Sequence, residues 1–217
     1  MEETDNEQIS HQLISRIATV LSVVLHPLLM PFYCMAMLFT LPTYIAYAFP
    51  FRFQLLIYSI VLITTFMMPV FSAILLFKRG AITDLYLNNR SERVLPFFIA
   101  ALYYFLCYYL FRQLPVPAVL VAVILGACIS VSLALVINFF WKISIHMIGI
   151  GGLFGMLISI STLFGTVIIL PVVIVTLIAG LLGTARLISG RHSALQIYTG
   201  FLTGAAVEYI MLTFFAK

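Results

Sequence analysis

Long apolar runs separated by short polar segments make up most of this chain of 217 residues. A helix crosses the roughly 30 Å hydrocarbon core of a bilayer with about 20 apolar residues. The pattern therefore predicts an all-α fold, a polytopic transmembrane helix bundle of about seven spans. The predicted spans are Ile17 to Thr40, Phe53 to Phe77, Leu95 to Phe111, Pro117 to Phe140, Met147 to Phe164, Val167 to Leu187 and Ala194 to Phe215.

Glycine and proline positions predict how these spans are shaped. One helix from Met147 to Leu187 would be about 60 Å long, twice the bilayer core, so a turn must separate the fifth and sixth spans. Proline lacks a backbone donor, and we expect His26-Pro27 and Pro31 to kink the first span and Pro69 the second. Glycines four residues apart allow close helix approach. These pairs are Gly151 with Gly155 and Gly200 with Gly204.

Composition excludes a soluble globular protein. Hydrophobic residues make up 64% and charged residues 8% of the chain, and its mean hydropathy is +1.18. Soluble domains carry about a quarter charged residues. We therefore expect a single transmembrane domain over residues 17–217 behind an acidic tail over residues 1–16.

Charge and cysteine usage exclude two further classes. The net charge of +4 is spread between apolar runs without a basic block, so nucleic acid is not an expected partner. Cys34, Cys107 and Cys128 lie inside apolar runs, where cysteine is a small hydrophobe, and they indicate neither a disulfide framework nor a metal cluster.

Polar residues gather in the loops after the second, fourth and sixth spans, which an even number of crossings places at one end of the bundle. We assign the candidate site to residues 78–96, 141–146 and 186–196 of these loops. The positive-inside rule alone accounts for cations in cytoplasmic loops. It does not explain why the two loop histidines, His146 and His192, share this end, each before a glycine-rich helix.

The surroundings of His192 suggest its chemistry. If the following segment is helical, His192 and Gln196 share one face, and the amide can hold the imidazole. The helix N-terminus attracts anions and keeps the ring neutral. A neutral imidazole beside Arg186 and Arg191 suits attack on a phosphate. The alternative is that both arginines only anchor a loop next to the membrane.

Together the three loops fit metal-free phosphoryl transfer. Asp84 and Glu92 stand alone, so no metal and no cofactor are expected. One histidine would attack phosphorus, cations would neutralise the phosphoryl oxygens, and the second histidine would protonate the leaving alkoxide. The expected partner is a membrane lipid, with a phosphorylated lipid or polyprenyl substrate.

These residues resemble the motifs of the type 2 phosphatidic acid phosphatase superfamily of membrane lipid phosphatases, in a divergent, short form. The likeness covers about half of the chain. The third motif of the family is matched best, by Ala185-Arg186, His192, Gln196 and the run from Gly200 to Gly204. The second is matched in part by Lys142-Ile143-Ser144-Ile145-His146, and the first by Lys78, Arg90 and Arg93 before Pro96.

The resemblance implies a role for each matched residue. His192 would be the nucleophile, Gln196 its orienting residue and His146 the general acid. The phosphate ligands would be Lys78, Arg90, Arg93, Lys142, Ser144, Arg186 and Arg191. The irregular spacing of the first motif leaves open which of Lys78, Arg90 and Arg93 takes each role. The implied reaction is hydrolysis of a lipid or polyprenyl phosphate monoester or diphosphate through a phosphohistidine intermediate.

Departures from the motifs keep a second interpretation open. Gln196 stands where the family has aspartate, and it can fix the tautomer of the imidazole but cannot balance an imidazolium. Ile145 stands where the second motif has glycine. The alternative is a catalytically degenerate relative that binds anionic lipid head groups. A transporter would need repeated halves with broken helices, which are not evident.

Polar residues inside the spans are weaker candidates. His26, Asn138 and Glu208 are each predicted either to take part in function or to bridge neighbouring helices.

Two signals disagree on the side of the membrane. Eight of the 11 Lys and Arg residues lie on the side of the candidate loops, which favours a cytoplasmic site. Five of those eight can instead be explained by a substrate, and without these five the two sides carry equal numbers; they are Arg90, Arg93, Lys142, Arg186 and Arg191. The resembled family generally faces outward, so we expect a multi-pass protein of the cell (inner) membrane with an extracytoplasmic site. The oligomeric state is left open.

Overall fold

The computed structural model describes residues 13, 16–85, 87 and 89–216. Across these residues the chain is helical without strands, and seven helical segments are long and apolar enough to cross a membrane. The predicted all-α bundle is confirmed, and the protein is a multi-pass membrane protein. The acidic tail predicted over residues 1–16 falls almost entirely outside the described residues. The spans are Arg16–Thr40, Phe51–Lys78, Ser91–Gln113, Ala118–Phe140, Ile145–Phe164, Ile169–Ile188 and Ala194–Phe215.

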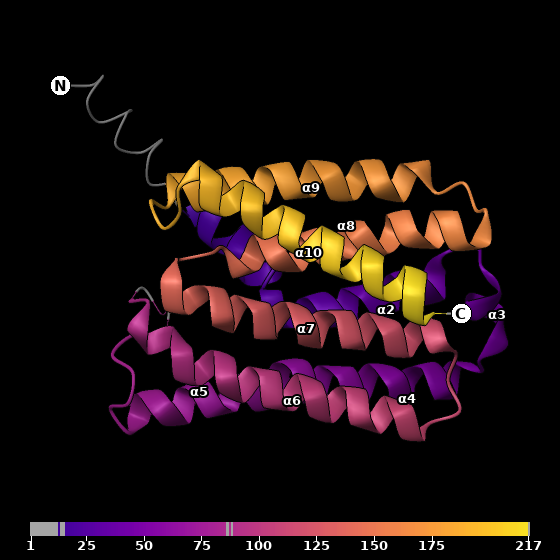
Figure 1. Cartoon of the computed structure of the whole chain (residues 1–217), viewed down its shortest axis with the longest axis horizontal. Helices are drawn as coiled ribbons and strands as arrows, with labels where there is room; N and C mark the ends of the chain where they lie inside the picture. The colour runs from indigo at the N-terminus through magenta and orange to yellow at the C-terminus, as the bar shows by residue number, and fades with distance from the viewer. Residues whose placement is uncertain (1–12, 14–15, 86, 88, 217) are drawn as a thin grey trace.

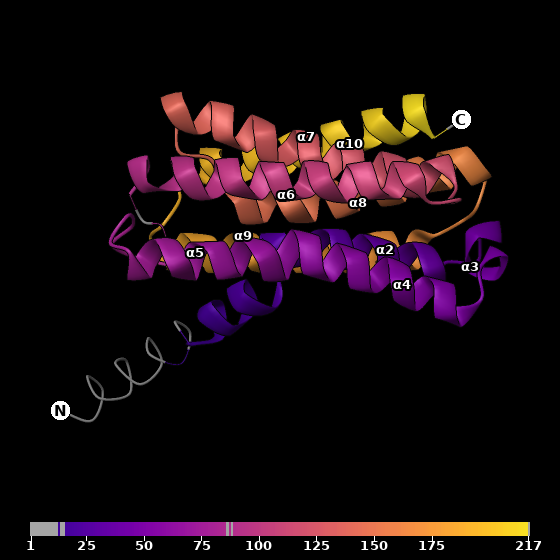
Figure 2. The same cartoon turned by 90° about the horizontal axis from the view of Figure 1, so that it is seen from below.

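The first span is broken at His26. Residues 16–24 are helical, His26 has an extended backbone (φ −64°, ψ 135°), and the short helix η1 (Pro27–Leu29) and then α2 (Met30–Thr40) follow. The residue before a proline avoids the helical region, and Pro27 has no N–H to donate to the preceding turn. The sequence therefore imposes the break itself. Figure 2 shows the helix over residues 16–24 leaving the direction of α2.

The second span is irregular just before Pro69. After the short α3 (Tyr44–Ala48), α4 (Phe51–Val61) continues into the π-helical segment η2 (Leu62–Met67) and α5 (Met68–Lys78). Pro69 cannot donate to the carbonyl of Thr65, and the backbone responds with wider turns ahead of it. The hydroxyl of Thr65 donates to the Leu28 carbonyl at 3.2 Å. This bond links the irregular parts of the first two spans.

The remaining spans are regular helices. A short helix, η3 (Ser91–Arg93), leads into α6 (Val94–Gln113), followed by α7 (Ala118–Phe140), α8 (Ile145–Phe164), α9 (Ile169–Ile188) and α10 (Ala194–Phe215). The helix α8 ends at Gly165, whose φ of 60° is a left-handed conformation that glycine adopts without strain. The turn predicted between the fifth and sixth spans is therefore present.

Glycines bring α8 and α10 into backbone contact. A Cβ atom on Gly155 would collide with the carbonyl oxygen of Ala205, and one on Gly204 would collide with the carbonyl oxygen of Ile148. Figure 1 shows α10 crossing α8. The close approach that the paired glycines predict is confirmed for these two helices, and α8 is the most enclosed of the seven spans.

The three candidate loops lie at one end of the bundle. In Figure 1 the α5–α6, α7–α8 and α9–α10 connections are on the left, and the C-terminus is on the right. The placement by counting spans is therefore confirmed. The packed pair α8 and α10 carries both loop histidines at its start, which brings the chemistry of two separate loops to one place.

Candidate functional site

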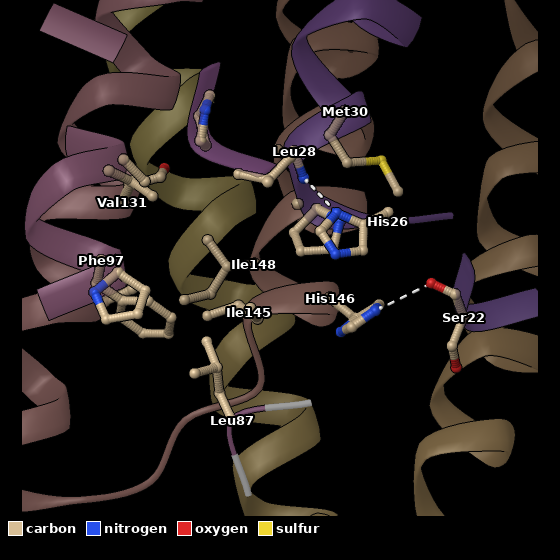
Figure 3. Close-up of a pocket in the computed structure, with 18 of the residues that line it drawn as sticks. Ser22, His26, Leu28, Met30, Leu87, Phe97, Val131, Ile145, His146 and Ile148 are labelled. Atoms are coloured by element: carbon tan, nitrogen blue, oxygen red, sulfur yellow. Dashed lines mark hydrogen bonds between the residues drawn. The ribbon is translucent and has the colours of Figure 1, made fainter. Parts of the chain in front are cut away.

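A cavity of about 550 Å³ enters the bundle from the end that carries the three loops. Its walls come from the first span and from α5, α6, α7 and α8, and they are mostly apolar. Polar side chains line it in two places. One group gathers near the loops and contains Arg93, Arg186, Arg191, His192, His146, His26 and Ser22. Figure 3 shows His146 and Ser22 facing each other beside the apolar lining.

A capping box fixes the position of His192. Ser193 is the N-cap of α10, where its hydroxyl accepts from the N–H of Gln196 and its own N–H donates to Gln196 Oε1 at 3.2 Å. A backbone N–H can only donate, so the atom of Gln196 that it meets is the oxygen. The same Oε1 lies 3.2 Å from Nδ1 of His192 and accepts its proton. The spacing Ser193-x-x-Gln196 is the sequence signal for this box.

Electrostatics keep His192 neutral. It is 7% exposed. Burial, followed by the positive charges of Arg186 and Arg93, lowers the pKa of His192 to about 3. A neutral ring that carries its proton on Nδ1 has an unprotonated Nε2. His192 therefore presents a nucleophilic lone pair at neutral pH.

Arg186 extends from the last turn of α9 into the same cavity. Arg186 is 5% exposed, and its Nη1 donates to the hydroxyl oxygen of Ser22 at 3.3 Å. Its Nε is buried and finds no acceptor in the described part of the chain. A buried guanidinium with unused donors is suited to an anionic ligand.

His146, the second residue of α8, is held by the first span. Its Nε2 donates to the carbonyl oxygen of Ser22 at 3.1 Å, which leaves Nδ1 as an acceptor, and Nδ1 has no partner among the described residues. The ring meets His26 edge to face, with 5.8 Å between the centroids. Nδ1 of His26 accepts from the Leu28 N–H at 3.3 Å. His26 thus belongs to the site. The sequence feature that marks His26 is its position directly before Pro27, where the first span breaks.

Sequence reasoning missed Ser22. One residue of the first span offers its hydroxyl to Arg186 and its carbonyl to His146. No motif or spacing marks this serine, because it reaches the site only through the break at His26.

Arg93 and Arg90 have different surroundings in the structure. Arg93 is 5% exposed and lines the cavity; its Nε donates to the Leu87 carbonyl at 2.7 Å, and its Nη1 lacks an acceptor in the residues described. Arg90 is exposed and does not line the cavity. Its Nη1 donates to the Phe140 carbonyl at 2.7 Å, and its own carbonyl accepts from Asn138 at 2.9 Å. Arg90 and Asn138 therefore join the start of α6 to the end of α7.

The other predicted ligands do not line the cavity. Lys78 is exposed at the end of α5. Lys142 is half-buried, and burial together with the charges of Arg93, Arg186 and Arg191 lowers the pKa of Lys142.

Ser144 is fully buried beneath the start of α10. Its N–H donates to the Gln196 carbonyl at 3.4 Å, and its hydroxyl has no partner within the described residues. A Cβ atom on Gly200 would lie 2.8 Å from the Ser144 carbonyl oxygen. Ser144 therefore packs against α10 rather than lining the cavity.

The assembled groups can bind an anion and attack it. Arg93, Arg186 and Arg191 supply positive charge, and the neutral His192 supplies a nucleophile. Among the described residues, no three His, Cys, Asp or Glu side chains group as they would around a metal ion. Comparisons with models of known protein families, with curated proteins and with solved structures found no match.

Proposed function

We propose that this protein hydrolyses a lipid or polyprenyl phosphate monoester or diphosphate, without a metal ion, through a phosphohistidine on His192. The supporting observation is the bond between His192 Nδ1 and Gln196 Oε1, because it leaves Nε2 unprotonated beside the arginines that line the cavity. The motif resemblance to membrane lipid phosphatases supports the same reaction. The cations would hold the phosphate, and the apolar walls would hold the chain.

In this reaction Nε2 of His192 attacks phosphorus as the P–O bond to the lipid breaks. Arg186 and Arg93 neutralise the charge on the phosphoryl oxygens. The leaving oxygen takes the Nε2 proton of His146 while that ring is an imidazolium with a second proton on Nδ1, which leaves His146 as neutral imidazole. The neutral ring then takes a proton from the water that cleaves the N–P bond, and the imidazolium is restored. This role requires His146 to give up its bond to the Ser22 carbonyl.

Ser22 would be the group that the substrate displaces. Its two oxygens already occupy one donor of Arg186 and the donor of His146. Oxygens of a bound phosphate would accept from the same donors. Residues 16–24 would then shift about the break at His26 while the rest of the bundle keeps its packing.

A second candidate is binding of an anionic lipid head group without turnover. It is favoured by the amide of Gln196, which cannot balance the charge that develops on His192 during attack. It is also favoured by Ser144, whose hydroxyl is enclosed away from the cavity.

We place the protein in the cell (inner) membrane with the site at the extracytoplasmic face. This placement rests on the motif resemblance, and the excess of cations at the loop end opposes it. The seven spans found in the described residues put Arg16 and Ala216 on opposite sides of the membrane. A reporter fused to the C-terminus should therefore be active in the cytoplasm, and a reporter active only outside would reverse the orientation.

Phosphate release by the purified full-length protein tests the reaction. Lipid and polyprenyl monophosphates and diphosphates would be the substrates, and an acid-labile, alkali-stable phosphoprotein would be trapped on rapid quenching. We expect both signals from the native protein and neither from His192→Ala. Arg112→Ala, an exposed change at the opposite end of α6, is the matched control and should retain both. The binding alternative replaces the enzyme if native protein and Gln196→Asp release no phosphate while anionic lipid binds in an Arg186-dependent way.

A further inference from the structure

The cavity has a second polar place, deep inside the bundle. Beyond the polar group at the loop end, its walls are apolar until Tyr104 of α6, Ser130 of α7, Cys34 of α2 and Glu208 of α10. Glu208 lies about 20 Å along the axis of α10 from its first residue, Ala194. This deep polar group is therefore separated from the head-group end by most of the thickness of a bilayer core.

Glu208 is the unusual member of the deep polar group. Its side chain is 3% exposed, it lines the cavity, and its Oε1 has no hydrogen-bond partner within the described chain. Burial of a carboxyl group without a partner is unfavourable, so such groups mark functional positions in membrane spans. Gly126 of α7 leaves the room that the carboxyl fills, because a Cβ atom there would lie 2.8 Å from the carboxyl carbon.

The surroundings of Glu208 indicate a neutral partner. Tyr104, Ser130 and Cys34 carry hydroxyl or thiol groups, and the lining arginines all lie at the other end of the cavity. A ligand amine would need a carboxylate that stays ionised in these apolar walls, which is strongly disfavoured. A hydroxyl group both donates and accepts, and it matches a carboxyl with an open oxygen.

We propose that Glu208 and its neighbours form a subsite for a hydroxyl group near the far end of the ligand's apolar chain. The ligand is then an amphiphile with a phosphate at one end and a hydroxyl about 20 Å away. The phosphate end of this assignment rests on the proposed function. The hydroxyl end rests on the cavity and on Glu208 alone.

Equilibrium binding of two matched probes tests this subsite. Hexadecyl phosphate and 16-hydroxyhexadecyl phosphate differ only at the chain end, and His192→Ala in the full-length protein prevents their consumption. We expect the hydroxylated probe to bind about tenfold more tightly, since it satisfies a buried polar group. Glu208→Leu should abolish the preference, and Glu208→Gln should keep most of it.

Ser132→Ala is the control, since its hydroxyl donates to the Cys128 carbonyl at 2.8 Å on the same helix without lining the cavity. Ser132→Ala should prefer the hydroxylated probe as strongly as the His192→Ala protein in which it is made. Equal binding of both probes, a preference that survives Glu208→Leu, or tighter binding of 16-aminohexadecyl phosphate overturns the subsite.

Phosphate release with His192 intact separates the two proposals. A hydroxyl preference without release keeps the subsite and rejects the hydrolase. Phosphate release without a hydroxyl preference keeps the hydrolase and rejects the subsite. If neither probe binds, both the hydrolase and the subsite are rejected.

Discussion

The carbonyl oxygen of Ser22 lies 3.1 Å from Nε2 of His146, which joins the first span to the start of the fifth (Figure 3). The hydroxyl of Ser22 also accepts from Arg186. A single residue thus occupies donors of two site residues. Any phosphate that binds there must compete with an internal oxygen pair, and the affinity for anions includes the free energy of displacing it.

Ser22→Ala should therefore strengthen anion binding. It removes the hydroxyl that occupies Arg186 and keeps the carbonyl that holds His146. We expect inorganic phosphate to bind about threefold to fivefold more tightly, the equivalent of roughly one neutral hydrogen bond. Titration with phosphate as a competitor of a lipid phosphate measures the change. Weaker binding would mean that the hydroxyl positions Arg186 for the ligand.

Gln196→Asp should raise the rate of phosphate release. An aspartate accepts the Nδ1 proton of His192 and also balances the charge that develops on the ring, as the amide cannot. We expect kcat to rise at least tenfold, with His192→Ala inactive in both backgrounds. Gln113→Asp, at the opposite end of α6, is a control for added charge. In a protein that only binds head groups, Gln196→Asp would weaken anion binding without any release.

His192 should titrate at a lower pH than an ordinary histidine. Its pKa of about 3 lies below the ordinary value of about 6.5, so the folded protein leaves this ring neutral over that window while the unfolded chain protonates it. Stability conferred by this group is therefore complete above about pH 6.5 and falls toward pH 3. Nitrogen NMR of the histidines should show His192 neutral, with Nδ1 protonated, at pH 5.

Arg186→Gln should raise the pKa of His192, because the positive charge of Arg186 opposes protonation of the ring. A His192 that titrates between pH 6 and 7 in the native protein would contradict this account of its surroundings.

Arg93 and Arg90 should respond differently to truncation. Arg93→Ala removes a guanidinium that lines the cavity, and we expect lipid phosphate binding to weaken tenfold or more. Arg90→Ala should change binding less than threefold, since Arg90 contacts Phe140 outside the cavity. Binding curves for both variants at one salt concentration make the comparison. A larger loss of binding in Arg90→Ala than in Arg93→Ala would contradict this prediction and would indicate that the head group binds at the loop surface.

Gly204→Ala should destabilise the bundle. The added Cβ collides with the Ile148 backbone, and overpacking of this kind costs about 1–3 kcal/mol. Gly180→Ala is the matched control, since no atom lies within 4 Å of a Cβ there and alanine favours the helix by up to about 1 kcal/mol. Thermal unfolding in one detergent should separate the two variants. Equal thermal unfolding midpoints for the two variants would contradict the prediction, since they would show that α8 and α10 can move apart to accommodate the added Cβ.

The sequence predicts the fold well because the bilayer imposes one length on every span. The predicted spans differ from the observed ones by a few residues at their ends, and the turn at Gly165 follows from length alone. The common end of the three loops follows from counting crossings. The break at His26 follows from the proline after it.

The contacts within the site depend on helix rotation and on tertiary packing. Arg93 and Arg90 are three residues apart in a short helical turn, and only the turn's orientation decides which guanidinium faces the cavity. Ser144 precedes His146 by two residues, yet α10 covers Ser144, whereas His146 lines the cavity. Ser22 meets His146 across 124 positions of sequence, which no local pattern encodes.

The backbone contact between α8 and α10 divides the molecule into two parts with different freedom to change. Both loop histidines begin helices of this locked pair, so their separation is insulated from substitutions in the other spans. The first four spans supply most of the remaining cavity wall. A chimera that exchanges those spans with a distant homologue would inherit a new chain preference and would keep His146, Arg186 and His192, while Arg93 and Ser22 would be replaced by the residues of the homologue.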